Sequence, residues 1–177
     1  MIAKREYANA FFSLAEEEGK CEKLLIDLRT IVKVVEQNAK YLDLLDTPSL
    51  PKEEKLSLID EAFSSLDEYA VNLMKLLAEK RLSRLIPSIL EEYEALYDEK
   101  FNILRVEAVS AVAMSEEQLS RLAKKLENEN GKTVIITNTV NPEILGGLKL
   151  RYAGIQLDGS LKTRLDSIEA SLKSIIV

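Results

Sequence analysis

The hydrophobic residues of this 177-residue chain change their spacing once, near residue 103, and this change constrains the fold more than any other feature. Before it, apolar residues recur at intervals of three and four, the spacing of one face of an α-helix. After it, they alternate with polar residues or form β-branched runs, which is typical of strands. We therefore expect two domains, a helical one over residues 1–104 and a mixed one over residues 105–177.

Apolar stripes predict six helices in the first domain. Five of the stripes run over residues 21–35, 41–45, 56–63, 73–77 and 85–101. The first stripe consists of Ala3, Tyr7, Ala10, Phe11 and Leu14. Six helices joined by short loops predict a compact bundle.

Several residues indicate where these helices begin and end. Gly19 is the expected end of the first helix, and Pro51 suits the first turn of the fourth. Ser65 and Glu68 have the spacing of a capping box, so we expect the fifth helix to begin there. Pro87 must lie in the first turn of the sixth helix, because proline would break a helix further along.

The second domain begins with a run, residues 106–112, that predicts a strand. Ser115 and Gln118 have capping-box spacing and start a helix that is expected to end near Gly131. Residues 133–140 are β-branched at nearly every position and predict a strand, and residues 148–157 predict a hairpin that turns at Ala153 and Gly154. A final amphipathic stripe over residues 161–175 predicts a helix, so the order β-α-β-β-β-α indicates a small α+β domain.

Composition excludes several kinds of functional site. The chain has no histidine and a single cysteine, Cys21, which excludes histidine-dependent catalytic triads, histidine-ligated zinc and iron–sulfur clusters. The net charge is −6, and the first 105 residues hold 21 acidic against 15 basic side chains, which argues against general affinity for nucleic acid or anionic lipid. We therefore expect protein partners, and neither a cofactor nor a metal.

Membrane insertion and secretion are not predicted either. The longest uncharged stretch, residues 133–142, is far shorter than the roughly 20 apolar residues of a membrane-spanning helix. The first residues lack the apolar core of a secretory signal. We expect a cytosolic chain.

Two short motifs resemble catalytic sites but lack essential parts. Gly146 and Gly147 precede a lysine without the spacing of a phosphate-binding loop, and a tight turn before a strand explains them. Asp158 and Ser160 flank Gly159, but no histidine is present to activate the serine, so Ser160 is expected to cap the last helix. An enzyme is the least favoured of the functions considered.

The first apolar stripe allows two interpretations. Stripes in a bundle usually face the core, and that interpretation applies to the others. Ala10, however, lies beside Tyr7 and Phe11, and its small side chain leaves a shallow place where a partner helix could bind. The sequence alone leaves both interpretations open.

Four segments resemble a known family. They are YANAF at residues 7–11, NLMKLLAE at residues 72–79, GGLKLR at residues 146–151 and IQLDGSLKTRL at residues 155–165. Together they resemble the delta-subunit family of bacterial F-type ATP synthases, whose mitochondrial counterpart is the oligomycin-sensitivity-conferring protein. The resemblance spans the whole chain, and the C-terminal motif is its most specific part.

The resemblance implies a non-catalytic role in the peripheral stalk, or stator, of a complex that makes ATP with a proton or sodium gradient. In this family the helical domain holds the N-terminal helix of an alpha subunit, and the C-terminal domain holds the stalk's b subunits, so that the catalytic head resists rotor torque. The implied location is peripheral, at the cytoplasmic face of the bacterial inner membrane. The alternative is an unrelated cytosolic adaptor or regulatory protein with a helical bundle.

The resemblance also implies site residues. The family's groove for the alpha helix lies between the first and fifth helices and matches Tyr7, Ala10 and Leu76, to which helical spacing adds Phe11, Leu73 and Lys80. Relatives often have Asn-Gly-Arg-Leu at residues 79–82, where this chain has Glu-Lys-Arg-Leu, so the turn there is expected to differ. The C-terminal motif matches at positions expected to act mainly in folding, with the two arginines as candidate contacts: Gly146, Gly147, Arg151, Asp158, Gly159, Arg164 and Leu165.

Overall fold

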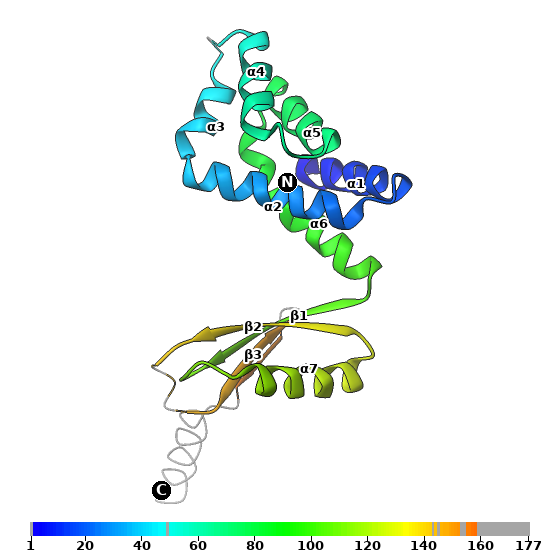
Figure 1. The fold of residues 1–177 in the computed structure, drawn as a ribbon, viewed down its shortest axis with the longest axis vertical. Helices are drawn as coiled ribbons and strands as arrows, with labels where there is room; N and C mark the ends of the chain where they lie inside the picture. The colour runs from blue at the N-terminus through cyan, green and yellow to red at the C-terminus, as the bar shows by residue number, and fades with distance from the viewer. Residues whose placement is uncertain (1, 49, 143, 145, 153–154, 159–177) are drawn as a thin grey trace, which may run out of the picture. The chain divides into compact units, whose positions relative to one another are not determined.

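The computed structural model describes residues 2–48, 50–142, 144, 146–152 and 155–158 (Figure 1). The chain divides after Tyr97 into two compact units, seven residues before the boundary expected from the sequence. Among the described residues, six α-helices and one short 3₁₀ helix precede the first strand. They are α1 (Ile2–Glu17), α2 (Cys21–Gln37), α3 (Ala39–Asp46), α4 (Lys52–Phe63), α5 (Glu68–Glu79), the 3₁₀ helix Ser83–Leu85 and α6 (Ile86–Lys100).

One hydrophobic core holds the helical unit together. It contains buried side chains from all six helices. Tyr93 of α6 is its largest fully buried residue, and its ring lies 5.2 Å from that of Phe12 in an edge-on arrangement. The Tyr93 hydroxyl donates a hydrogen bond of 3.0 Å to the backbone carbonyl of Cys21, and burial raises the pKa of this phenol. The sixth helix is thereby bonded to the first turn of α2.

The start of α5 differs from the expectation. The sequence predicts a capping box at Ser65 and Glu68, but the structure places the N-cap at Asp67, whose carboxylate accepts a hydrogen bond from the Tyr69 backbone N–H at 3.2 Å. Asp67 is the cap because its side chain, which is only 4% exposed, forms ion pairs with the ammonium groups of Lys20 at 3.0 Å and Lys23 at 2.8 Å. The prediction from Ser65 was wrong because it used local spacing alone.

Asp67 also joins α5 to α2 through its backbone. Its N–H donates a buried hydrogen bond of 3.0 Å to the carboxylate of Asp27 on α2. The two lysines, the backbone N–H of Tyr69 and the nearby charges together lower the pKa of Asp67 to about 2, with the Lys23 hydrogen bond as the largest cause. The start of α5 is therefore fixed by charged hydrogen bonds as well as by apolar packing.

The second unit contains a four-stranded sheet with the order β2-β1-β3-β4. Its strands are β1 (Ile103–Ser110), β2 (Thr133–Val140), β3 (Leu148–Tyr152) and β4 (Ile155–Asp158). β1 and β2 are parallel and pair from Ile103 with Thr133 to Ser110 with Val140, while β3 is antiparallel to both β1 and β4. The predicted hairpin of residues 148–157 is confirmed, and β1 begins three residues before its predicted start.

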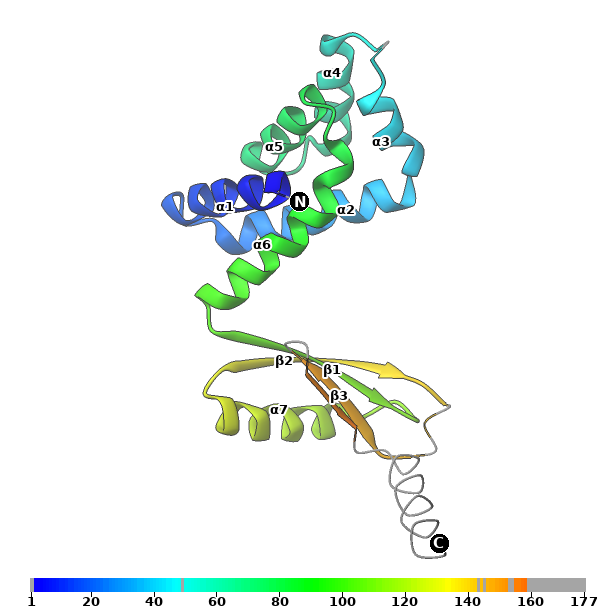
Figure 2. The ribbon, with the colours of Figure 1, turned by 180° about the vertical axis from the view of Figure 1, so that it is seen from behind.

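Helix α7 (Glu116–Asn130) connects the parallel strands and lies along one face of the sheet (Figure 2). Its predicted capping box is present, because Ser115 and Gln118 exchange hydrogen bonds, and Gly131 ends it in a left-handed conformation. Leu126 packs there against strand residues that include Val106 and Val134. The helix predicted for residues 161–175, with the turn at Ala153 and Gly154, lies outside the described residues.

Two interactions explain where the second unit begins. Arg105 of β1 donates two hydrogen bonds, of 2.6 and 2.8 Å, to the carboxylate of Asp98 in the last turn of α6. Asn102 then adopts a positive φ of 54°, and its backbone carbonyl accepts from the N–H of Thr133 at the start of β2. Because these contacts attach residues 98–102 to the sheet, the boundary falls within α6.

Replacing Tyr93 with phenylalanine tests the buried hydroxyl. We expect Tyr93→Phe to lower the free energy of unfolding by about 1 kcal/mol, because the hydrogen bond to the Cys21 carbonyl is lost without a large change in volume. Urea unfolding of the full chain, followed by circular dichroism, measures this change. Tyr7→Phe is the control, since the Tyr7 hydroxyl has no hydrogen bond within the described residues, and an equal loss in both variants would contradict the assignment.

The low pKa of Asp67 predicts a dependence of stability on acid. The folded-state pKa of about 2 lies below the ordinary value of 3.8. The ionised Asp67 carboxylate therefore contributes fully to the free energy of unfolding above about pH 5, and this contribution is lost as pH falls toward 2. Over that interval we expect the wild type to lose roughly 2 kcal/mol more than Asp67→Asn, which keeps the cap but carries no charge. Unfolding measured at pH 2, 3, 4 and 5 gives the comparison, and parallel pH profiles of the two proteins would refute the role of this charge.

Candidate helix-binding groove

A hollow of about 330 Å³ lies between α1 and α5, which run side by side in the helical unit (Figures 1 and 2). The lining residues of each helix are one, three or four positions apart, so each helix presents one face to the hollow. The lining consists of Tyr7, Ala10, Phe11, Leu14, Tyr69, Asn72, Leu73 and Leu76. Apart from the two phenols and Asn72, every lining side chain is apolar.

The groove has a buried floor and an exposed rim. Phe11 and Leu73 form the floor, with 5% and 7% of their surface exposed, and both also belong to the core. Leu76 is 42% exposed, which is high for a leucine beside a core, and Ala10 is exposed as well. An exposed leucine next to a small residue is an arrangement into which the apolar face of another helix can pack.

The first apolar stripe of the sequence lies on the flank of α1, to one side of the most buried face of this helix. The side chains of α1 that face the core are Ala8, Phe11, Phe12 and Ala15. Tyr7 and Leu14 are half-buried, and Ala10 is exposed, so the stripe is rotated from the core toward the groove. This flank therefore lies along the hollow, while Phe11 also packs in the core.

Three groove residues were expected from the resemblance and three more from helical spacing, and all of them except Lys80 line this hollow. Lys80 is the C-cap of α5 and is exposed. The chain then turns in a Schellman motif, in which Arg81 has a positive φ of 58° and the Leu82 N–H donates to the Leu77 carbonyl at 2.8 Å. Lys80 thus lies at the end of α5, just before the turn.

The sequence analysis did not assign Tyr69, Asn72 or Leu14 to the groove. Tyr69 and Asn72 precede Leu73 and Leu76 by three or four positions, so a helical wheel of α5 would have found them. The Lys20 ammonium lies 4.8 Å from the centre of the Tyr69 ring, a cation–π distance. Desolvation, followed by the Glu18 carboxylate, raises the pKa of Tyr69, so this phenol stays neutral.

The C-terminal motif lies partly in the described residues. Gly146 and Gly147 have φ values of 146° and 89°, which side chains rarely adopt, so a substitution at either position would strain the backbone. Arg151 is exposed on β3 and donates to Gln156 at 3.3 Å and to Glu107 at 3.4 Å. Asp158 forms an ion pair of 2.8 Å with Lys149, while Gly159, Arg164 and Leu165 lie outside the described residues.

The described residues contain neither a metal-binding cluster nor a membrane-spanning helix. No cluster of three or more cysteine, aspartate or glutamate side chains could hold a metal ion there. No helix in the same residues is long and apolar enough to cross a membrane.

Comparisons with known proteins match nearly the whole chain. The profile of the family ATP synthase delta (OSCP) subunit matches residues 2–172. The ATP synthase subunit delta of Clostridioides difficile is 35% identical over 178 residues, covering 99% of this chain and 98% of the relative. That of Caldanaerobacter subterraneus subsp. tengcongensis is 33% identical over 176 residues, with the same coverage.

A solved structure shares the fold. It is a chain of the cryo-EM structure of the Toxoplasma gondii mitochondrial ATP synthase hexamer, which matches with a TM-score of 0.71 at 20% identity and covers 96% of each chain. At this identity the match establishes the fold alone: a helical region followed by a small sheet. The family profile and the full-length relatives establish more, namely that this chain belongs to the ATP synthase delta (OSCP) subunit family.

Proposed function

We propose that this chain is the peripheral-stalk subunit that ties the catalytic head of an F-type ATP synthase to the stalk, and that the groove between α1 and α5 binds the N-terminal helix of an alpha subunit. The observation that supports the groove is its lining, in which the exposed Leu76 and Ala10 lie above the buried Phe11 and Leu73. Family membership makes the subunit structural rather than catalytic.

The chemistry of the groove suits a connection that bears torque. Burial of apolar surface contributes about 25 cal/mol per Å², whereas an exposed ion pair contributes only about 0–1 kcal/mol. A helix whose apolar face covered Leu76, Ala10 and the Tyr7 ring would therefore dissociate slowly. The polar exceptions, Asn72 and the two phenols, would fix its register by hydrogen bonding.

The finer parts of the assignment are proposals of the same kind. The six helices would act as one bundle for the head, and the α+β unit would hold the b subunits, with Arg151 as a candidate contact because it is exposed. The subunit would lie at the cytoplasmic face of the bacterial inner membrane, attached only through its complex. An unrelated adaptor is not favoured, because relatives named ATP synthase subunit delta match over 94–99% of this chain.

A carboxylate placed in the groove tests the proposal. Ala10→Asp and Leu76→Asp should each weaken binding to a synthetic alpha N-terminal peptide from the same organism at least tenfold, because the partner would bury an unpaired charge. Isothermal titration of the full chain measures the affinity, and circular dichroism verifies folding.

The matched control is Ile26→Asp, on an α2 residue that is 54% exposed and lies outside the groove lining. Its affinity should equal that of the wild type. Unchanged binding in both groove variants, or an equal loss in the control, would refute the groove as the binding site while leaving the family membership intact.

A further inference from the structure

The side chain of Lys55, on the first turns of α4, is largely buried, but its ammonium reaches solvent. Only 7% of its surface is exposed, yet its ammonium forms no hydrogen bond or ion pair with any residue that the structure describes. Because its stem is enclosed and its charge is unpaired within the described residues, the ammonium is available to an anion that enters from solvent.

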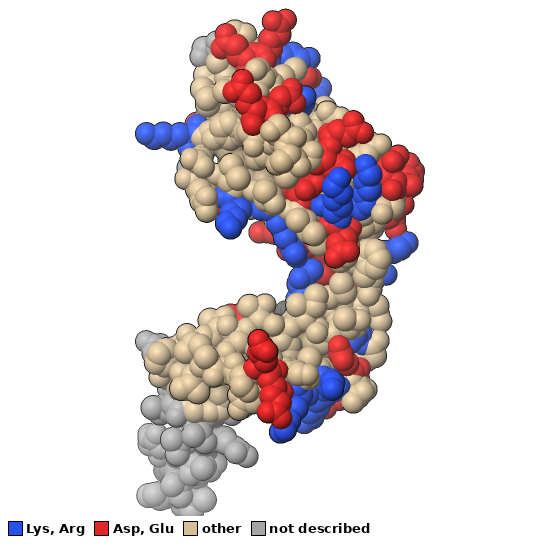
Figure 3. Space-filling view, in the orientation of Figure 1, with Lys and Arg blue, Asp and Glu red and all other residues tan. Residues whose placement is uncertain are grey.

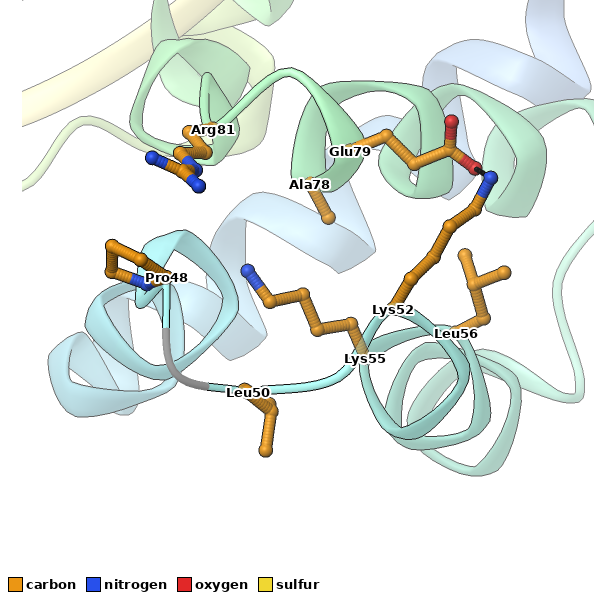
Figure 4. A pocket seen from close by; sticks show the side chains of 8 residues that line it. All are labelled: Pro48, Leu50, Lys52, Lys55, Leu56, Ala78, Glu79 and Arg81. Atoms are coloured by element: carbon orange, nitrogen blue, oxygen red, sulfur yellow. Dashed lines mark ion pairs between the residues drawn. The ribbon is translucent and has the colours of Figure 1, made fainter.

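The Lys55 ammonium ends in a hollow of about 230 Å³ between the start of α4 and the end of α5 (Figure 4). Pro48, Leu56 and Ala78 give the hollow apolar walls. The Lys55 side chain runs across it toward the side where Arg81 lies. This hollow is separate from the α1–α5 groove, and the two share no lining residue.

The hollow has an excess of positive charge. Lys52 and Glu79 form an ion pair of 2.9 Å across one side, so their charges compensate each other. Arg81 has no ion pair within the described residues and, with Lys55, leaves two positive charges uncompensated. This excess contrasts with the acidic side chains that gather over α4 on the face drawn in Figure 3.

We propose that this hollow binds a single oxyanion group, a carboxylate or a phosphate, between the Lys55 ammonium and the Arg81 guanidinium. Lysine supplies a point charge at the floor, and arginine offers a planar pair of donors that matches two oxygens of such a group. The volume of the hollow accommodates one such group. The site rests on these residues alone and not on the proposed groove.

Titration of the full chain with two simple anions tests the site. Amide NMR spectra are recorded with sodium phosphate and with sodium acetate, against sodium chloride at equal ionic strength. We expect saturable shifts at residues 52–56 and 78–82. Saturation by acetate as well as phosphate supports a carboxylate ligand such as an acidic side chain, and saturation by phosphate alone supports a phosphate ligand.

Two variants remove one cation each without threatening the fold. Lys55→Met keeps the length of the side chain, and Arg81→Gly places glycine where φ is 58°. Each should weaken anion binding at least tenfold, whereas Lys33→Met, on an exposed α2 lysine, should leave it unchanged. Linear, non-saturating shifts in the wild type, or equal affinity in Lys55→Met and the wild type, would overturn the proposal.

Discussion

The placement of α5 is the constraint on which the rest of the helical unit depends, and both ends of this helix are fixed by specific polar contacts. At its start, Asp67 bonds to Asp27 through its backbone and to Lys20 and Lys23 through its carboxylate. Just beyond its end, the backbone N–H of Ser83 donates to the carboxylate of Asp46 on α3 at 3.2 Å. A helix held at both ends presents a constant face to α1, so the groove exists before any partner arrives, which reduces the entropic cost of binding.

The same helix contributes to two hollows of opposite character. Along its length it gives apolar side chains to the α1–α5 groove. Its last turn gives Ala78 and Glu79 to the cationic hollow beside α4, and Arg81 follows in the turn after the helix. Because recognition of an apolar helix and recognition of an anion need different surroundings, one short helix can serve both without competition between them.

The sequence predicted much of this fold from patterns that are local. Helical periodicity and the Ser115–Gln118 capping box depend on residues within a turn of one another, and the structure has them as predicted. The wrong predictions arise where tertiary contacts determine at which residue a helix or strand begins. Asp67 displaced Ser65 as a cap because lysines from α2 compensate its charge, and β1 began early because Ile103 pairs with Thr133. Neither contact is visible in the spacing of nearby residues.

The candidate groove shows the same limit of local sequence patterns at the level of single residues. Periodicity identified an apolar stripe on α1 with Ala10 at its middle. It could not predict that Ala8 and Phe12 would be the residues buried in the core, which leaves Ala10 exposed. Resemblance supplied Leu76 on the matching face of α5 and helical spacing added Leu73, whereas Lys80, also added by spacing, lies at the C-cap and does not line the groove. The cationic hollow lay beyond both methods, since Lys55 and Arg81 are 26 positions apart and only the packing of α4 against α5 brings them together. A site made by tertiary packing of two ordinary surface residue types has no local pattern, and a structure is needed to reveal it.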